Sequence, residues 1–130
     1  MQYADTRPGT YDKSGSCAIV VMLVENACFV ANVGDSRALM SAAGGQKLFV
    51  LSRDHRPNED TEKSRITEHG GKIYQTQTIQ NIGVGTETTT QHIILGPFRV
   101  LPGRLSVSRT FGDIEAKFEK YGGKPGVVIA

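Results

Sequence analysis

The stretch Cys17-Ala-Ile-Val-Val-Met-Leu-Val24, followed by Glu25-Asn26 and Ala27-Cys-Phe-Val-Ala-Asn-Val33, indicates the fold class of this chain. Each long run is rich in β-branched and apolar residues and has the length of a strand. The two residues between the runs have turn chemistry, so the stretch predicts an antiparallel hairpin in which Leu23 faces Cys28. Because the first run is continuously apolar, we expect its strand to be covered on both faces.

The same register determines what the two cysteines can do. Cys17 lies six residues before Leu23, so it should be about 20 Å from Cys28 at a rise of about 3.3 Å per residue. A disulfide needs Cα atoms within about 7 Å of each other. We therefore expect two free thiols that pack as small core residues.

Further short strands are predicted after this hairpin. Gly34-Asp35-Ser36 has turn chemistry, and Ala43-Gly44-Gly45 forms a second turn signal. The runs at 37–40 and 47–51 between and after these turns predict a third and a fourth strand. Four strands spaced by about ten residues are typical of an antiparallel meander.

Residues 59–69 are flanked by the start and stop signals of a helix. Asn58 can cap its start, acidic residues fill the first turn, and Gly70 can end it in the left-handed region. Ile66 is its only strongly apolar residue, so we expect the helix to cover the edge of a larger unit. A short strand is predicted at 72–75.

Residues 76–98 are the least regular part of the chain, with threonines and glutamines between isolated apolar residues. Their composition favours a mobile surface loop, and a polar hairpin around Gly83-Val84-Gly85 is the alternative. Two short strands, at 92–95 and 98–101, are predicted near its end.

Composition excludes several classes of protein. With 38% hydrophobic and 22% charged residues among 130, the chain is neither a disordered tail nor a fibrous protein, and it has room for one domain. No apolar run approaches the roughly 20 residues needed to span a bilayer, and the start has no signal-peptide pattern. We expect a soluble protein without a membrane partner in the cytoplasm, with the nucleus also compatible. A net charge of +2 does not predict nucleic-acid binding.

Asp35 is the first candidate for chemistry. It directly follows a predicted strand, so its carboxylate lies at the end of a sheet, where a hard divalent cation could use it. The alternative is that it bonds its own turn backbone, as aspartates in turns usually do. The three histidines lack metal-ligand spacing, and we interpret them as solvent or packing residues.

Four motifs occur in a fixed order between residues 15 and 113. They are Gly15-Ser-Cys-Ala-Ile-Val-Val21 with Phe29-Val-Ala-Asn-Val-Gly-Asp-Ser-Arg-Ala38, Leu51-Ser-Arg-Asp-His-Arg-Pro57, Glu62-Lys-Ser-Arg-Ile66 with Gly70-Gly71, and Gly103-Arg-Leu-Ser-Val-Ser-Arg-Thr-Phe-Gly-Asp113. Together they resemble the metal-dependent protein phosphatases, the type 2C serine/threonine family. Each motif alone would be weak, whereas four in order form a specific signal.

The resemblance implies an α+β fold, a partial α-β-β-α sandwich of mainly antiparallel strands with one or two outer helices. It also implies hydrolysis of phosphoserine and phosphothreonine in a phosphoprotein substrate by a binuclear Mn²⁺ or Mg²⁺ centre. Such ions acidify a bound water and neutralise the charge that develops on the phosphoryl group.

The resemblance places few of the family's site residues in this chain. Asp35 matches an aspartate associated with a weakly held metal, Arg109 falls in the flap beside the substrate cleft, and Asp113 and Arg37 are expected to be structural. The family's upstream Asp-Gly-His-Gly block has no match, and its downstream Asp-Gly and Gly-Asp-Asn blocks would fall beyond Ala130. We therefore expect no complete catalytic set, weak or no metal binding, and no activity from the isolated chain.

These observations divide the chain into a polar, disordered lead-in at 1–14 and the central part of a type 2C phosphatase-like domain at 15–130, with an insertion at about 76–102. The uncharged run 17–24 and the apolar end 127–130 should then lie exposed and favour self-association through sheet edges. Two other interpretations stay open: a pseudophosphatase or protein-binding module without catalysis, and a lone β-rich scaffold.

Overall fold

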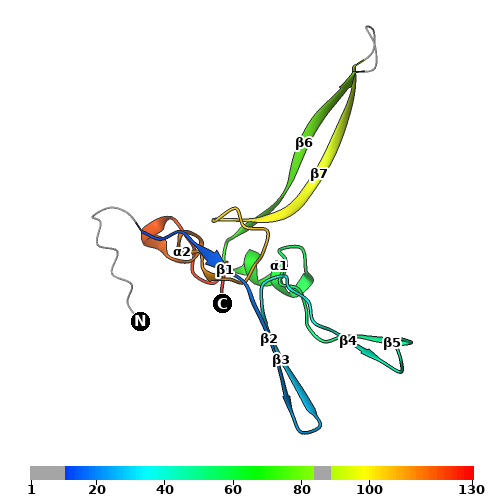
Figure 1. Cartoon of the computed structure of the whole chain (residues 1–130). Coiled ribbons are helices and arrows are strands. Elements are labelled where there is room, and N and C mark those ends of the chain that lie inside the picture. Colours follow the sequence, from blue (N-terminus) through cyan, green and yellow to red (C-terminus); the bar gives the residue numbers. More distant parts are fainter. Residues whose placement is uncertain (1–10, 84–88) are drawn as a thin grey trace.

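The computed structural model, which describes residues 11–83 and 89–130, has three hairpins that project from a small packed centre (Figure 1). Its elements are β1 (Gly15–Ser16), β2 (Ala18–Val24), β3 (Ala27–Val33), β4 (Leu39–Ala42), β5 (Lys47–Val50), α1 (Asp60–Glu68), β6 (Lys72–Gly83), β7 (Thr89–Leu101), β8 (Phe111–Gly112), α2 (Ile114–Lys117) and the 3-10 turn η1 (Glu119–Tyr121). The strands pair antiparallel as β1–β8, β2–β3, β4–β5 and β6–β7. This confirms an α+β fold of mainly antiparallel strands with two helices.

The β2–β3 hairpin has the predicted register, because Leu23 pairs with Cys28. The expectation that its first strand is covered on both faces is wrong, since Val20 is 60% exposed and Leu23 76% exposed. Cys17 and Cys28 are free and also exposed, so the prediction that they pack in the core is wrong. The physical reason is that β2 pairs with β3 alone in the described residues, and no further layer covers this two-stranded sheet.

The predicted four-stranded meander is also wrong, because β3 and β4 belong to separate sheets. The third strand begins at Leu39, two residues later than expected. Before it, the Ala38 N–H donates to Ser52 Oγ at 2.8 Å and the Ala38 carbonyl accepts from Leu51 N–H at 2.9 Å. These bonds tie the segment before β4 to the segment after β5, where a meander would have tied it to β3.

Helix α1 lies where the sequence predicts it. Of the two residues expected to mark its ends, one has the predicted role. Gly70 adopts a φ of 72°, the left-handed conformation that ends the helix. The prediction that Asn58 caps the start is wrong, because Glu59 occupies the cap position without a side-chain hydrogen bond. Neither α1 nor α2, the helices of the described residues, has the length and apolar character needed to span a membrane.

The packed centre contains few residues. It buries one apolar side chain of α1, one of β7, one of α2 and two of the chain end, namely Ile66, Val100, Ala116, Val127 and Val128. The expectation that the apolar end lies exposed is therefore wrong for Val127 and Val128. Arg65 of α1 donates to the carbonyls of Gly126 and Val127, and the Thr110 N–H donates to the Ile129 carbonyl at 2.8 Å. These bonds hold the end of the chain beside α1.

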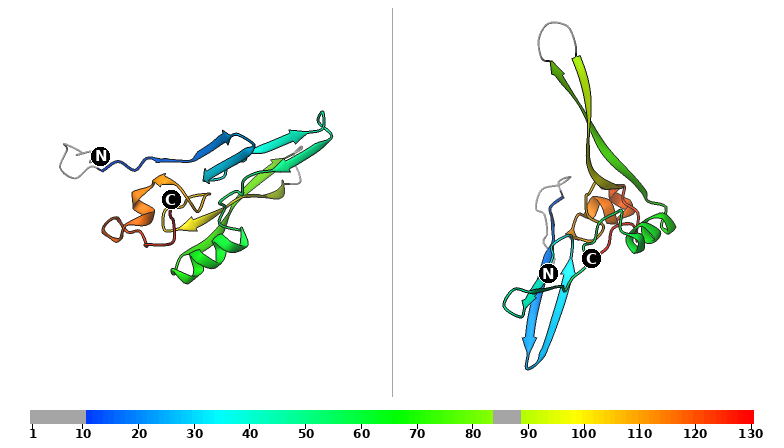
Figure 2. Two further views of the ribbon diagram at one scale, coloured as in Figure 1. Left: turned by 90° about the horizontal axis from the view of Figure 1, so that it is seen from below. Right: turned by 90° about the vertical axis from the view of Figure 1, so that its right-hand side faces the viewer.

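Strands β6 and β7 form a long arm, which corrects the surface-loop interpretation and confirms the alternative hairpin. They pair from Lys72 and Leu101 to Gly83 and Thr89, with an irregularity between Gln75 and Gln77. The two short strands expected near 92–101 are one continuous strand. The predicted turn around Gly83-Val84-Gly85 lies mostly outside the described residues. Figures 1 and 2 show that the arm points away from the other two hairpins.

Candidate functional site

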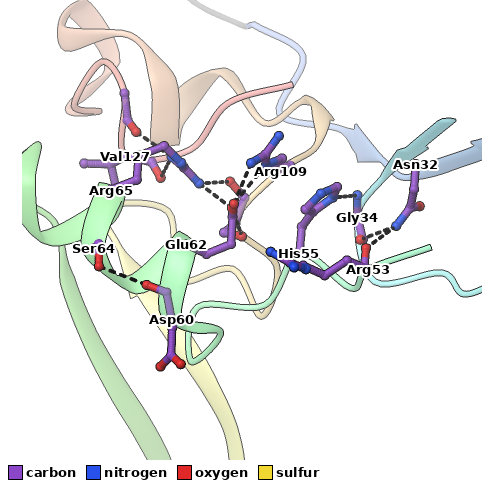
Figure 3. Close-up of polar contacts among 12 residues, drawn as sticks. Asn32, Gly34, Arg53, His55, Asp60, Glu62, Ser64, Arg65, Arg109 and Val127 are labelled. Carbon is purple, nitrogen blue, oxygen red and sulfur yellow. Dashed lines mark hydrogen bonds and ion pairs between the residues drawn. The ribbon is translucent and has the colours of Figure 1, made fainter. Parts of the chain in front are cut away.

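Asp35 follows β3 directly, and its position depends on a clamp around Gly34. Gly34 has a φ of 113°, and a Cβ at this position would collide with the Cys17 side chain, so only glycine suits it. The Gly34 N–H donates to His55 Nδ1 at 3.3 Å, and its carbonyl accepts from the His55 N–H at 2.9 Å. Figure 3 shows His55 beside Gly34. The clamp therefore determines where the chain leaves the strand and where Asp35 begins.

The carboxylate of Asp35 is partly exposed and faces a cation. Its Oδ2 lies 3.4 Å from Arg56 Nη2. The two side chains line a pocket of about 260 Å³ together with Asn58, Ser106 and the β7 residues Pro97 and Phe98. The base of the β6–β7 arm and the candidate metal ligand thus share one pocket.

This pocket does not fit a binuclear metal centre. Mg²⁺ and Mn²⁺ take several oxygen ligands, and a bridged pair needs carboxylates between the ions. Asp35 forms an ion pair with the Arg56 guanidinium, which already balances the charge of its carboxylate. Within residues 11–83 and 89–130, no three side chains of His, Cys, Asp or Glu come close enough to hold an ion. The pocket therefore offers one carboxylate, that of Asp35, to a cation.

Arg37 binds the buried carboxylate of Asp54, which is 6% exposed. Its Nε and Nη2 donate to the two Asp54 oxygens at 2.9 and 2.8 Å. The hydrogen bond from Arg37 holds the pKa of Asp54 below its usual value, while burial acts in the opposite direction. Arg56 Nε lies 3.5 Å from the same carboxylate and so links Asp54 to Asp35. These contacts support a structural role for Arg37, which stays a prediction.

A second charged cluster surrounds Glu62 of α1, which is 1% exposed. Arg109 Nη2 and Nε donate to its Oε1 at 2.6 and 3.1 Å, and Arg65 Nη2 donates to its Oε2 at 2.6 Å (Figure 3). The Ser108 hydroxyl donates to Oε2 as well. This Glu62 cluster joins α1 to the segment 106–110, and through Arg65 to the carbonyls at the end of the chain.

Burial alone would raise the pKa of Glu62, but the hydrogen bonds outweigh it. Donation from Arg109, Ser108 and Arg65 lowers the pKa of this carboxyl to about 2. A buried carboxylate with several charge-assisted bonds is fully satisfied, which is the condition under which a buried charge is tolerated. Arg109 is therefore held by α1, and the proposed substrate-side role of this residue stays a prediction.

Asp113 lies between α2 and the start of the described chain. It occupies the cap position of α2 with a φ of 48°, and its N–H donates to the Ser14 carbonyl at 2.9 Å. A Cβ at Gly15 would collide with its carboxylate, so Gly15 allows β1 to pass close by. Nearby, Glu115 of α2 accepts from Tyr11 Oη at 2.7 Å. Asp113 thus connects α2 to β1, which supports its proposed structural role.

The structure puts the four predicted residues in three places. Arg37 and Asp35 are linked through Asp54 and Arg56, whereas Arg109 lies in the Glu62 cluster and Asp113 lies at α2. In the described part of the chain, no hydrogen bond or ion pair joins Asp35 or Arg37 to Arg109 or Asp113, but the Ser108 N–H donates to the His55 carbonyl and so links the Glu62 cluster to the Asp35 turn.

The sequence did not indicate which residues bind the predicted site residues in the structure. Glu62 and Arg65 are visible as neighbours on one helix, but Glu62 and Ser108 are 46 residues apart. His55, for which the sequence indicates a solvent or packing role, is half-buried. Its ring accepts the Gly34 N–H, and its carbonyl accepts from the Ser108 N–H at 2.9 Å. Burial lowers the pKa of His55, and the charge of Arg109 lowers it further. The Asp-His pair inside the motif at 51–57 was the only available signal for this role.

Comparison with known proteins gives these motifs a family. The family model described as Protein phosphatase 2C matches residues 2–130. "Probable protein phosphatase 2C member 13, mitochondrial" of Oryza sativa subsp. japonica is 35% identical over 85% of this chain and 24% of its own length. "Probable protein phosphatase 2C 25" of Arabidopsis thaliana is 37% identical over 81% of the chain and 21% of its own length.

A third relative, "Probable protein phosphatase 2C 52" of Oryza sativa subsp. japonica, is 44% identical over 55% of the chain. The chain spans between 14% and 24% of the length of these three relatives. Because the family model extends over nearly the whole sequence, the match covers all four motifs and the residues that form the Asp35 pocket and the Glu62 cluster. The chain belongs to the protein phosphatase 2C family.

Proposed function

We propose that this chain is part of a serine/threonine protein phosphatase whose whole protein removes phosphate from phosphoserine and phosphothreonine in a phosphoprotein, with Mn²⁺ or Mg²⁺. The family match over residues 2–130 carries the proposal. The described residues support it, because Asp35, an acidic residue of the family's motifs, lines a pocket together with Arg56, Asn58 and Ser106. A cytoplasmic location belongs to the same proposal.

In this proposal the described residues serve as a framework for the reaction. The Gly34–His55 clamp positions Asp35, and the Glu62 cluster holds Ser108 and Arg109 in the segment that the family uses as a flap. Both groups of contacts meet at His55, whose carbonyl accepts from the Ser108 N–H. A movement of the flap segment would therefore reach the Asp35 turn through one residue.

The framework by itself is not expected to catalyse hydrolysis. Phosphate-ester hydrolysis requires an activated nucleophile and compensation of the charge that develops on the phosphoryl oxygens. The described pocket offers a single carboxylate, and Arg56 already compensates it. We therefore expect the 130-residue chain to be inactive and to bind Mn²⁺ in the millimolar range, as sites with few charged ligands do.

The first test uses the purified 130-residue chain, a phosphothreonine peptide and Mn²⁺. Phosphate release should not exceed that of Asp35→Asn, and calorimetric titration should show only weak Mn²⁺ binding. Turnover that a chelator and Asp35→Asn both abolish would contradict the inactivity of the chain while supporting the phosphatase class. Micromolar Mn²⁺ affinity lost in Asp35→Asn would show that further ligands complete the site.

The second test uses a longer protein that contains this sequence. Asp35→Asn should raise the Mn²⁺ concentration needed for half-maximal activity without unfolding the protein, whereas Asp60→Asn, an exposed acidic residue of α1, should not. Activity indifferent to Asp35→Asn would disprove the metal role. A folded, longer protein without any phosphatase activity would favour the pseudophosphatase alternative.

A further inference from the structure

Asn32 is the polar exception on one face of the β2–β3 hairpin. Alternate residues of a strand share a face, and residues paired across two strands lie on the same face. Asn32 pairs with Ile19, so its face of the hairpin includes Val21 from β2 and Val30 and Cys28 from β3. The residue is half-buried. A polar group that leaves water needs hydrogen-bond partners, so the partners of this amide indicate what the residue does.

The Asn32 amide donates two hydrogen bonds. Its Nδ2 lies 3.1 Å from the Gly34 carbonyl oxygen and 2.8 Å from the Arg53 carbonyl oxygen (Figure 3). Because both partners are acceptors, the atom that faces them must be the amide nitrogen. The amide oxygen is buried and has no hydrogen-bond partner among the described residues. The two carbonyls therefore determine the orientation of this side chain, even though its own acceptor stays unpaired.

Each of these two carbonyls belongs to a peptide that leads into an acidic residue. A peptide unit is planar and includes the Cα atom of the residue that follows it. Holding the Gly34 carbonyl therefore positions the Cα atom of Asp35, and holding the Arg53 carbonyl positions that of Asp54. One amide group thus sets the position of one acidic residue relative to the other.

Arg56 connects the same two acidic residues. Its Nη2 lies 3.4 Å from Asp35 Oδ2, and its Nε lies 3.5 Å from Asp54 Oδ2. Asp54 is also held by Arg37, whose nitrogens donate to its two oxygens at 2.9 and 2.8 Å. Because Asp54 is fixed in this way, the position of Asp35 relative to it decides whether the Arg56 guanidinium can reach both carboxylates.

The bonds of His55 alone would not fix the peptide before Asp35. His55 accepts the Gly34 N–H at its Nδ1 and donates its own N–H to the Gly34 carbonyl at 2.9 Å. A carbonyl oxygen has two lone pairs, and a carbonyl held by one donor can still rotate about that bond. The Asn32 amide occupies the second lone pair, so the two donors together fix the direction of the Gly34 carbonyl.

We propose that Asn32 is a positioning residue for Asp35. Its amide fixes the direction of the Gly34 carbonyl and so sets where the Asp35 carboxylate lies in the pocket that it shares with Arg56. The effect on activity rests on the proposed function, in which Asp35 serves Mn²⁺ or Mg²⁺. The geometry of the turn does not rest on it and is measured without metal.

Amide hydrogen exchange of the metal-free 130-residue chain, followed by NMR, tests this geometry. Asn32→Leu keeps a branched side chain and removes the donor. The His55 N–H, which donates to the Gly34 carbonyl, should then exchange about tenfold faster. The hydrogen-bonded Gly71 N–H at the end of α1 should keep its rate. Asn32→Ala removes the same donor without a larger side chain and should give the same result.

Asn26→Leu is the matched control, because Asn26 is an exposed residue in the turn of the same hairpin. It should change neither exchange rate. A His55 rate that stays unchanged in both Asn32 variants, or an equal acceleration at His55 and Gly71, would overturn the proposal. The second outcome would mean that the amide only adds to the overall stability of the chain.

A longer protein that contains this sequence tests the consequence for activity. Asn32→Leu should raise the Mn²⁺ concentration for half-maximal activity by about tenfold and leave the rate at saturating Mn²⁺ within about twofold. In an Asp35→Asn background the same change should add no further shift, because the amide acts through Asp35. An equal shift in both backgrounds, or a shift for Asp35→Asn alone, would overturn the positioning role. Indifference of both variants to Mn²⁺ would disprove the proposed metal role of Asp35 and the effect on activity, and the exchange rates would then decide the geometry.

Discussion

The packed centre and the projecting hairpins use their apolar residues in opposite ways. Ile66, Val100 and Val127 of the centre are completely buried, whereas Val20 and Leu23 of β2 are 60% and 76% exposed. Yet β2 is the most apolar segment of the chain, and α1 has one strongly apolar residue. β2 and β3 pair without a second layer in the described residues, whereas in the centre α1, α2 and the chain end supply the layer that burial needs. Apolar sequence therefore did not predict burial here.

The two regions also differ in how they treat charge. In the centre, Arg65 and Arg109 both donate to the Glu62 carboxylate, and Glu62 is 1% exposed. The β2–β3 hairpin has one charged residue, in its turn. In the centre, the ion pairs and hydrogen bonds of the Glu62 cluster connect segments that are distant in sequence, as buried apolar contacts do elsewhere. If this is correct, stability should respond strongly to changes in the centre and weakly to equal changes in the hairpins.

The largest effect is expected for Glu62→Gln. This change leaves the guanidinium groups of Arg65 and Arg109, which are 16% and 33% exposed, without their negative partner. Breaking an ion pair whose carboxylate is buried typically costs about 3–5 kcal/mol of unfolding free energy. Urea unfolding followed by far-UV circular dichroism measures it. Glu68→Gln, on an exposed position of the same helix, is the control and should stay within about 0.5 kcal/mol. A loss below about 1 kcal/mol for Glu62→Gln would mean that the cluster does not hold the centre together.

The same apolar substitution in both regions tests the comparison itself. Ile66→Ala removes a completely buried side chain and should cost about 3 kcal/mol through lost burial and a cavity. Ile79→Ala removes a side chain that is 61% exposed on the β6–β7 arm, and should cost less than about 1 kcal/mol. Equal losses in urea unfolding would remove the distinction between centre and hairpins.

The free energy of unfolding should depend on pH in the range in which Glu62 is protonated. Its pKa is about 2 in the folded chain, below the ordinary 4.5 that applies when it is unfolded. The unfolded chain therefore takes up the proton first as the pH falls. The stabilisation is complete above about pH 4.5 and is lost between there and about pH 2, by about 3 kcal/mol at most.

Urea unfolding at a series of pH values measures this loss, and Glu62→Gln should flatten the profile in that window. His55 acts at higher pH with the same sign, since its lowered pKa makes stability fall once the pH drops below about 6.5. A profile that is identical in the parent chain and Glu62→Gln between pH 4.5 and 2 would contradict the assignment.

The smallest of these effects concerns the junction between hairpin and centre. Gly34→Ala and Gly44→Ala both place a methyl group at a positive φ, 113° and 63°, and this strain costs about 1 kcal/mol at each site. Only at Gly34 would the methyl group also collide with Cys17, so its loss should be about 1 kcal/mol larger. Equal losses would show that the turn before Asp35 relaxes easily and does not position it.

Local sequence signals predicted the local structure well. The Leu23–Cys28 register follows from two strand-like runs and a two-residue turn, and the end of α1 at Gly70 follows from the conformational freedom of glycine. The family also followed from motifs that are short in sequence. The arm β6–β7 was harder, because its threonines and glutamines alternate too weakly to distinguish a strand from a loop.

The sequence by itself determined the β2–β3 hairpin with its register, the short strands β4 and β5, helix α1, and the family, because each follows from short stretches of neighbouring residues. Only the tertiary structure decided which apolar residues are buried and which charges meet. The apolar end at Val127 and Val128 became core, while the more apolar β2 stayed exposed. Glu62 binds Ser108 and Arg109, which are more than forty residues away in the sequence. Burial and ion pairing depend on which segments share space, and a linear pattern of side chains contains no such distances.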